Sequence, residues 1–449
     1  MRPFKITALL VAAVLATSAS AVGEDPGFPA VLNVRQRAET IARITKKRLD
    51  TVLPMAMRRA GFDMWIIVSR EDNYDPVFNT MIPDNAWCPI TQILVFHDPG
   101  PGKQIERMNI SRTKMDELHA STWDYRAWDN EKRESQWDCL ARIVKERDPR
   151  KIGINESDVI WAADGLTASL KTKLLSVIGP EYAARCSSAE PMASLWLQTL
   201  LPEDVELYER AVAISHAIIA ETMSRKVITP GVTTTDDLVY HYAQRASDLG
   251  LPRAPWNWFA VKGRTAEMIE RYGKNDKVIR PGDLIQCDVG LVYLRYWTDH
   301  CEWGYVLKPG ETDAPEGFKK LMAEGNRLQD IFRGEFQTGR TGNEMLAAIL
   351  KKAKEQGIGK PKIYSHSIGY YAHEPGPLVG LPWEQANTGK RGDVRLVPNS
   401  TLTAELSVAG PVPELGGQEL NMALEQIMLF TEEGTRFLDG RQTRFHLVK

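Results

Sequence analysis

The stretch from residue 285 to 306 reads IQCDVGLVYLRYWTDHCEWGYV and carries Asp288 and Asp299 inside apolar, β-rich runs. If the link between the runs closes as a hairpin centred near residues 293 and 294, the two aspartates face each other across the strands. Their Cβ atoms would then lie about 4.5–5.5 Å apart on one sheet face. Such carboxylates repel each other, so the pair should share a proton or bind a cation. Considered alone, this stretch is explained equally well if one of the aspartates lies at an exposed turn or strand edge.

The first 21 residues have the layout of a secretory signal. Two basic residues precede an apolar run at 6–16, and Ala19, Ser20 and Ala21 follow, so we expect cleavage after Ala21. No later segment approaches the roughly 18 apolar residues that a membrane-spanning helix needs. We therefore expect an exported protein, periplasmic or secreted, with no membrane span.

Charge and cysteine content narrow the classes of partner. Without the signal, the chain has 54 basic residues against 58 acidic ones, a formal charge of −4. This balance offers no electrostatic surface for nucleic acid or an anionic membrane, so we expect a peptide or small-molecule partner. The five cysteines form a sparse, odd set without metal-ligand spacing and predict at most one or two disulfides.

The mature chain is longer than one hydrophobic core usually organises, and its pattern changes near residue 200. Helical spacing at 33–61, strand-like runs at 62–69 and 91–98, and later alternation predict an α/β domain over residues 30–195. From residue 200 to 440 the order helix, helix, hairpin occurs twice, which suggests a second domain with pseudo-twofold symmetry.

Two glutamates repeat the anomaly of the aspartates. Glu405 in TLTAELSV and Glu425 in MALEQIMLF are lone carboxylates in apolar β-runs, where an unpaired charge would cost several kcal/mol. Together with His366, the four carboxylates make a hard, oxygen-rich ligand set that suits Mn, Fe, Co or Zn and can neutralise two divalent cations. A two-metal site of this kind activates water and polarises a carbonyl, which supports hydrolysis at neutral pH.

These residues resemble the signature of the pita-bread metallopeptidase family, which includes aminopeptidase P, prolidase, methionine aminopeptidase and creatinase. The resemblance covers about residues 202–434, and the α/β domain ahead of it is similar to that of the aminopeptidase P, prolidase and creatinase branch. It implies a two-domain α/β protein with an N-terminal creatinase-like domain and a C-terminal catalytic pita-bread α+β domain. The motifs that carry it are DVG at 288–290, TDH at 298–300, SHSIG at 365–369, HEPGP at 373–377, Glu405 and Glu425.

The resemblance also implies roles for the five ligands and an assembly. Asp288 would bind one metal ion, Asp299 and Glu425 would bridge both, and His366 with Glu405 would complete the other. Manganese is our first expectation for the two ions, with Co, Zn or Fe as alternatives. The same resemblance implies a homodimer.

Two of the implied roles concern the reaction itself. Glu405 would also take a proton from the attacking water. His373 falls where the family has a histidine that contacts the substrate and the developing tetrahedral centre. The alternative interpretation of His373 is a neutral core histidine.

Three other residues are candidates for substrate binding. Arg271 stands where peptidases of this branch carry a histidine, and a guanidinium cannot exchange protons but can clamp a carboxylate. Arg271 therefore either holds a substrate carboxylate or is a surface residue. Trp258 and Tyr370 could line a substrate pocket, with core packing as the other interpretation.

The leading hypothesis is an exported two-metal hydrolase that cleaves a C–N bond, namely the amide before proline, as an Xaa-Pro aminopeptidase or prolidase-like enzyme. The alternative keeps the fold and the metals but performs non-peptide C–N hydrolysis or a lyase reaction, as creatinase shows the scaffold can host. Besides Arg271, the family's Gly-His-Gly and Glu-Pro-Gly are replaced at 365–367 and 405–407, which favours this alternative. A non-catalytic binding protein is the third hypothesis, but it should have lost ligand positions, and none is lost.

Overall fold

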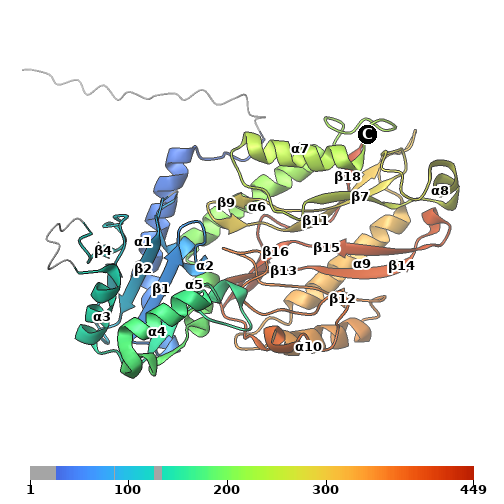
Figure 1. Cartoon of the computed structure of the whole chain (residues 1–449). Helices are drawn as coiled ribbons and strands as arrows, with labels where there is room; N and C mark the ends of the chain where they lie inside the picture. Colours follow the sequence, from blue (N-terminus) through green and yellow to red (C-terminus); the bar gives the residue numbers. More distant parts are fainter. Residues whose placement is uncertain (1–26, 85, 126–133) are drawn as a thin grey trace, which may run out of the picture.

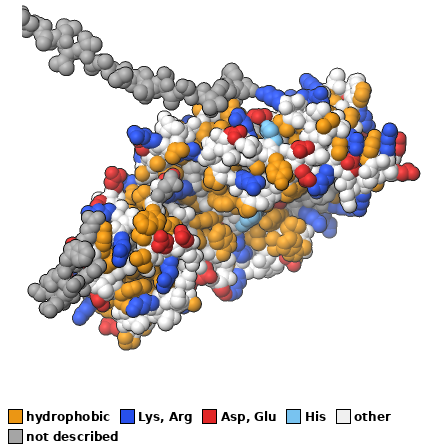
Figure 2. Space-filling view, turned by 45° about the horizontal axis from the view of Figure 1, so that its top comes forward, with side chains coloured by type: hydrophobic (Ala, Val, Ile, Leu, Met, Phe, Trp, Pro, Cys, Tyr) orange, Lys and Arg blue, Asp and Glu red, His pale blue; other side chains and the backbone are white. Residues whose placement is uncertain are grey.

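The computed structural model describes residues 27–84, 86–125 and 134–449, so the predicted signal at 1–21 lies outside the described residues. An N-terminal α/β domain lies beside a larger domain built from two helix pairs and the sheets between them (Figure 1). Acidic and basic side chains are interspersed on the face seen in Figure 2, and hydrophobic side chains gather across its middle. Among the helices of the described residues, none combines the length and apolar character needed to cross a bilayer.

The N-terminal domain is a six-stranded sheet with helices on both faces. Helix α1 (Val34–Ala60) begins at Asn33, whose side chain caps the first turn, and ends at Gly61 in a left-handed conformation, as the sequence predicts. The strand order is β4-β3-β2-β1-β5-β6, and β1 pairs antiparallel with β2 but parallel with β5. The strands are β1 (Met64–Arg70), β2 (Thr91–His97), β3 (Glu106–Asn109), β4 (Ala120–Ser121), β5 (Ile152–Ile154) and β6 (Cys186–Ser188).

Both faces of this sheet are buried because alternate side chains of β1 enter different hydrophobic clusters. Trp65 and Ile67 pack in the cluster that includes α1, whereas Ile66 and Val68 pack in the cluster that includes two other helices. The remaining helices of the domain are α2 (Pro76–Met81), α3 (Gln136–Arg147), α4 (Ala168–Ala183) and α5 (Glu190–Gln198).

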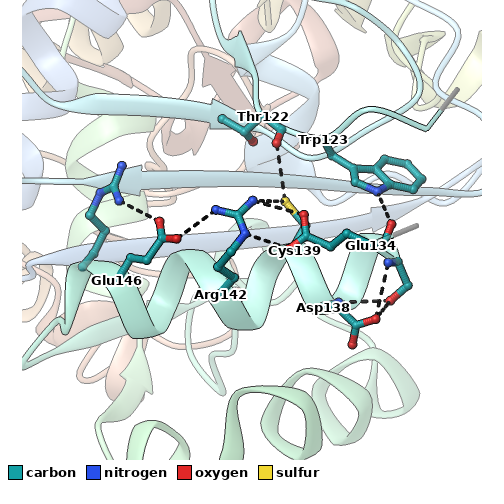
Figure 3. A network of polar contacts seen from close by, with 9 residues as sticks. Thr122, Trp123, Glu134, Asp138, Cys139, Arg142 and Glu146 are labelled. Atoms are coloured by element: carbon teal, nitrogen blue, oxygen red, sulfur yellow. Dashed lines mark hydrogen bonds and ion pairs between the residues drawn. The ribbon is translucent and has the colours of Figure 1, made fainter. Parts of the chain in front are cut away.

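A polar network on α3 holds the outer part of this domain together (Figure 3). Arg142 donates through Nε and Nη2 to the two carboxylate oxygens of Glu134 and through Nη1 to Glu146. The indole N–H of Trp123 donates to the backbone carbonyl of Glu134 at 2.9 Å. Burial raises the pKa of the Cys139 thiol in this network to about 12, so Cys139 stays protonated and serves packing. The five cysteines are free.

The larger domain contains two helix pairs with sheets between them (Figure 1). Helices α6 (Pro202–Thr222) and α7 (Thr235–Asp248) cover one side, and α9 (Glu316–Arg333) and α10 (Gly342–Glu355) cover the other. The first sheet has the order β18-β11-β8-β7, and two three-stranded sheets have the orders β12-β14-β15 and β13-β16-β17. The first sheet comprises β7 (Trp258–Gly263), β8 (Leu284–Val289), β11 (His300–Val306) and β18 (His446–Val448). The other two comprise β12 (Lys362–Ile363), β13 (Ser400–Thr403), β14 (Leu406–Pro411), β15 (Glu419–Leu424), β16 (Ile427–Thr431) and β17 (Gly434–Phe437).

The aspartate hairpin is shifted by two residues from the predicted register. Strands β9 (Val292–Tyr293) and β10 (Tyr296–Trp297) enclose a turn made of Leu294 and Arg295, one residue later than predicted. Both turn residues have positive φ, 52° and 73°, as a tight two-residue hairpin requires. Asp288 therefore stands opposite Cys301 instead of Asp299. A shift of two keeps both aspartates on one sheet face, now as diagonal neighbours.

A buried ion pair joins the two domains. Arg48 of α1 lies 2.7 Å from Asp204 of α6, and both side chains are almost completely buried. The guanidinium of Arg48 also lies 4.8 Å from the ring centroids of Trp196 and Tyr370. Tyr296 donates its hydroxyl to Asp204 at 2.6 Å. The ring of Tyr370 therefore lies in the interdomain core, which agrees with core packing, the second of its two interpretations.

Candidate metal centre

The five predicted ligands lie at the ends of strands and in the breaks between them. Asp288 is near the end of β8, Asp299 comes directly before β11, and His366 follows β12 in an irregular segment. Glu405 lies between β13 and β14, and Glu425 lies between β15 and β16. Each glutamate thus occupies the point where the chain leaves one three-stranded sheet for the other. The sequence predicted unbroken strands at both positions, and the structure corrects this.

A single backbone bridge joins the two halves of the domain at this point. Cys301 of β11 and Glu425 exchange two backbone hydrogen bonds, each 3.2 Å long. Because Cys301 stands opposite Asp288, the bridge brings the carboxylate of Glu425 to the face that carries the aspartates. Residues from distant parts of the sequence therefore meet in one cluster.

The side-chain distances define three overlapping groups of candidate ligands, two of which consist only of the five predicted residues. The Nε2 atom of His366 lies 3.5 Å from Glu425, 3.6 Å from Glu405 and 3.9 Å from Asp299. The ligand atoms of His366, Glu405 and Glu425 lie within 4.8 Å of one another, and so do those of Asp288, Asp299 and Glu425. Glu425 belongs to both groups.

Burial strongly disfavours charge at this cluster. Burial raises the pKa of Asp288 to about 6 and raises the pKa of Asp299 well above its ordinary value, the latter helped by the charges of Glu425 and Asp288. Burial and three neighbouring carboxylates raise the pKa of Glu405 well above its ordinary value, and burial with the charge of Asp288 does the same for Glu425. Burial lowers the pKa of His366 to about 4. The neutral His366 therefore adds no positive charge to these carboxylates, and the charge of Lys262 only partly offsets the effect of burial on the pKa of Asp288.

The donor atoms fit divalent metal ions. Within the described chain, the buried atoms Nε2 of His366 and Oε1 of Glu425 have no hydrogen-bond partner. Unsatisfied buried polar atoms are rare in folded proteins and call for an explanation such as a bound ion. Carboxylate oxygens and an imidazole nitrogen are the donors that hard and borderline divalent ions prefer. These residues could therefore hold metal.

Gly290, which ends the DVG motif, allows the neck of the hairpin to close. A Cβ atom at this position would lie 2.0 Å from the carbonyl oxygen of Thr298, so no other residue fits without movement of the backbone. Thr298 in turn exchanges hydrogen bonds with Leu291 through its backbone N–H and its hydroxyl. This closure fixes Asp299, the next residue, at the end of the neck.

His373 lies at the edge of the cluster. Its ring centroid is 4.5 Å from that of His366 and 5.3 Å from that of Trp256, and the residue is half-buried. Its backbone carbonyl accepts a hydrogen bond from Arg391 at 2.7 Å. Burial, together with His366, lowers the pKa of His373 to about 4, so its imidazole is neutral near pH 7.

Three contacts at the site are not apparent from the sequence. Trp256 donates its indole N–H to Asp299, Arg391 pairs with Glu374 beside His373, and Tyr364 packs against the ring of His366 at 5.5 Å. The position of Tyr364, two residues before the candidate ligand His366, is a weak sequence signal for a role at the site. The position of Trp256 in an aromatic run is a similarly weak signal. Nothing in the sequence indicates Arg391.

Comparison with known proteins places the chain in a family. The sequence model of metallopeptidase family M24 matches residues 206–432, just over half of the chain. The chain belongs to this family. It is also 22% identical over 241 residues to the uncharacterized peptidase YqhT of Bacillus subtilis, which covers 52% of this chain and 60% of that relative.

Solved structures share the fold over nearly the whole chain. An X-Pro aminopeptidase from Thermotoga maritima is 18% identical with a TM-score of 0.62, covering 88% of this chain and 100% of its own. An Xaa-Pro dipeptidase from Bacillus anthracis is 17% identical with a TM-score of 0.59, covering 91% and 100%. The prolidase from Pyrococcus horikoshii is 15% identical with a TM-score of 0.54, covering 91% and 99%. At these identities the likeness shows the fold alone, a pita-bread domain preceded by an α/β domain.

In this M24 chain, the structure brings only one of the other predicted substrate residues to the cluster. Trp258 pairs with Asp288 across β7 and β8 and is half-buried. Arg271 lies in α8 (Ala266–Tyr272), which follows the far end of β7, and that end of the strand is about 16 Å from Trp258 at roughly 3.3 Å per residue. It is exposed and lies over the ring of Tyr272. Of its two interpretations, the structure favours the surface residue.

Proposed function

We propose that this chain is an exported peptidase that binds two divalent metal ions and cleaves the amide bond before proline, as an Xaa-Pro aminopeptidase or a prolidase-like dipeptidase. The observation that carries the proposal is that Glu425 belongs to two ligand groups, each confined within 4.8 Å. The names of the structural neighbours, X-Pro aminopeptidase, Xaa-Pro dipeptidase and prolidase, support the choice of substrate.

The two ligand groups would each hold one ion. His366 and Glu405 would serve the first, Asp288 and Asp299 the second, and Glu425 both. The predominance of carboxylate donors supports manganese, and the single imidazole leaves Co, Zn or Fe as alternatives. Divalent ions bound there would lower the pKa of a water molecule and polarise the substrate carbonyl.

The protein's own residues supply proton transfer and hydrogen bonding. The Glu405 side chain is 20% exposed, compared with 4% for Asp299 and 2% for Glu425, so it is the most accessible of these three carboxylates. Together with the family resemblance, this accessibility supports Glu405 over Asp299 and Glu425 as the group that would take a proton from the attacking water. The neutral imidazole of His373 presents an N–H group that can donate to the substrate oxygen as negative charge develops.

Location and assembly form part of the proposal. The basic and apolar pattern of residues 1–21 supports export to the periplasm or the medium. The near balance of acidic and basic residues favours a peptide substrate over nucleic acid. The family resemblance supports a homodimer, which light scattering of the purified mature chain would test.

The second candidate is a non-peptide C–N hydrolase or a lyase on the same scaffold. It is favoured by Arg271, which stands where the peptidases that this chain resembles have a histidine. Arg271 lies in α8, which follows the end of β7 that is far from the cluster. Serines also replace the glycines on both sides of His366. Ser365 donates its hydroxyl to the carbonyl of Thr403, and Ser367 bridges to Leu402, so these serines tie the His366 segment to β13.

The deciding experiment measures metal and turnover on the same preparation. Elemental analysis of protein lacking residues 1–21 is paired with hydrolysis of Xaa-Pro dipeptides and of longer Xaa-Pro peptides in Mn, Co and Zn. The matched variant is Asp299→Asn, which keeps the size of the side chain and removes its charge. A peptide series with Xaa-Ala in place of Xaa-Pro serves as the substrate control.

Each outcome separates the candidates. Two metal ions per chain with cleavage of Xaa-Pro peptides, both lost in Asp299→Asn, would establish the proposal. Two metal ions without cleavage of any peptide would overturn the peptidase and leave the non-peptide reaction. Absence of metal under every loading condition would overturn both.

A further inference from the structure

One indole connects a metal-ligand candidate to the histidine at the edge of the cluster. The Nε1 atom of Trp256 donates to Oδ1 of Asp299 at 3.0 Å. The other oxygen of that carboxylate, Oδ2, lies on the side of His366, 3.9 Å from its Nε2 atom. The two oxygens of Asp299 therefore face different partners, and the indole fixes the plane of the carboxylate.

The backbone holds Trp256 firmly over Asp299. The segment that precedes β7 is fastened to the neck of the hairpin on both sides of Trp256. Ala254 donates its N–H to the carbonyl of Gly290 at 2.9 Å, and Gly290 donates its own N–H to Oδ1 of Asn257 at 2.8 Å. Since Gly290 also sits against Thr298, the indole and Asp299 are positioned by the same closed neck.

Aromatic packing fixes the ring of Trp256 from two sides. It stacks on Trp297, with ring centroids 5.8 Å apart and planes inclined by 19°. It also lies 5.3 Å from the ring of His373. Rotation of the indole would therefore break the hydrogen bond to Asp299 and the contact with His373 together.

We infer that Trp256 is a positioning residue whose indole N–H orients the carboxylate of Asp299 for metal binding and whose ring holds His373 beside it. This inference rests on the proposed metal site. Groups that hydrogen-bond to metal ligands set ligand orientation, and their loss typically weakens metal binding ten- to a hundredfold. A buried indole that merely satisfies its N–H at the nearest acceptor would have no such effect.

The test compares loss of the hydrogen bond alone with loss of both the hydrogen bond and the ring. Trp256→Phe keeps an aromatic ring between Trp297 and His373 but deletes the N–H, and Trp256→Ala deletes both. Trp123→Phe is the matched control because it also deletes an indole N–H, one that donates to the backbone carbonyl of Glu134 in the N-terminal domain and to none of the five ligand candidates. Metal dissociation constants for Mn²⁺ and Co²⁺ are measured by calorimetry, and the visible absorption of the Co²⁺ form reports ligand geometry. Thermal unfolding confirms that each variant is folded.

We expect Trp256→Phe to bind metal at least about tenfold more weakly than wild type and to change the Co²⁺ spectrum, while Trp123→Phe matches wild type in both. Trp256→Ala should in addition raise KM for a peptide substrate, because His373 loses its support. Equal metal affinity in Trp256→Phe and wild type would overturn the inference, and so would equal weakening in the two Phe variants. If wild type itself binds no metal, the proposed function fails, an outcome distinct from either of these.

Discussion

The Nε2 atom of His366 lies 3.5 Å from Oε1 of Glu425, and within the described chain neither atom has a hydrogen-bond partner. Two buried polar atoms in this arrangement would each bear the cost of lost hydration. A cation between them removes that cost for both. The stability of the metal-free protein should therefore respond to the charge of Glu425.

The substitution Glu425→Gln should stabilise the metal-free protein but destabilise the protein when metal is bound. Without metal, the variant should unfold at a higher temperature than wild type, because a buried carboxylate becomes a neutral amide. With metal, wild type should be the more stable protein, and the variant should bind metal more than about a hundredfold more weakly. Thermal unfolding at pH 8 with chelator or with excess Mn²⁺ measures both. The same order of stability in the two conditions would contradict a metal role for Glu425.

His373 should matter for turnover without holding metal. His373→Gln should keep the wild-type metal content and lower kcat by about 10²–10³-fold, the usual effect of removing one hydrogen-bond donor to developing negative charge. Metal content and peptide turnover are measured on one sample. The possible ligand atoms of His373, Asp299 and His366 lie within 4.8 Å of one another. Loss of metal from the His373→Gln variant would therefore show that His373 binds metal.

Local signals in the sequence are sufficient to predict the long helices and to identify the carboxylates that the structure brings together. Helix α1 begins and ends where Asn33 and Gly61 supply caps, and α7 begins at Thr234, whose side chain caps its first turn. Lone carboxylates in apolar runs identify buried polar positions in any fold, which is why Glu405 and Glu425 stand out.

Tertiary contacts decide the features that the sequence did not predict. Leu294 and Arg295 carry no turn signal, and Arg295 is held there by hydrogen bonds to the carbonyls of Thr80 and Ile82 in the other domain. The burial of Tyr370 depends on Arg48, which lies in the first helix. Contacts between residues so distant in sequence leave no periodic pattern, so the register shift and the interdomain core appear only in the structure.

Breaking the interdomain ion pair should strongly destabilise the protein. Arg48→Ala leaves Asp204 buried and uncompensated, and such changes typically cost about 3–5 kcal/mol. Lys46→Ala is the matched control, because Lys46 and Asp50 form an exposed pair on the same helix and its loss should cost less than about 0.5 kcal/mol. Urea denaturation of the metal-loaded proteins measures both. Equal denaturation midpoints for the two variants would contradict a stabilising role of the buried pair.

The last prediction concerns pH and a second group of histidines, which lie on α6, β11 and β18. His216 of α6 lies 2.9 Å from Asp439 and 3.5 Å from Glu302, and its ring is 4.4 Å from that of His300. Glu302 also bonds His446 at 2.6 Å. Burial opposes the charged form of His216, but Asp439 and Glu302 outweigh it and raise its pKa above the ordinary value of 6.5. Burial keeps the pKa of His300 well below 6.5, so His300 stays neutral.

A histidine with a raised pKa in the folded state stabilises the fold fully below the pKa of the unfolded chain, and this contribution is lost as pH rises through the folded pKa. His216→Asn should therefore lower the melting temperature most near pH 6 and progressively less towards about pH 9. His241 provides a control of opposite sign, because burial lowers its pKa. Its neutral form is favoured by folding, so the contribution of His241 should instead fall as pH drops below about 6.5. Melting curves of both metal-loaded variants across this range measure the two trends, and parallel trends would contradict the opposite environments of the two histidines.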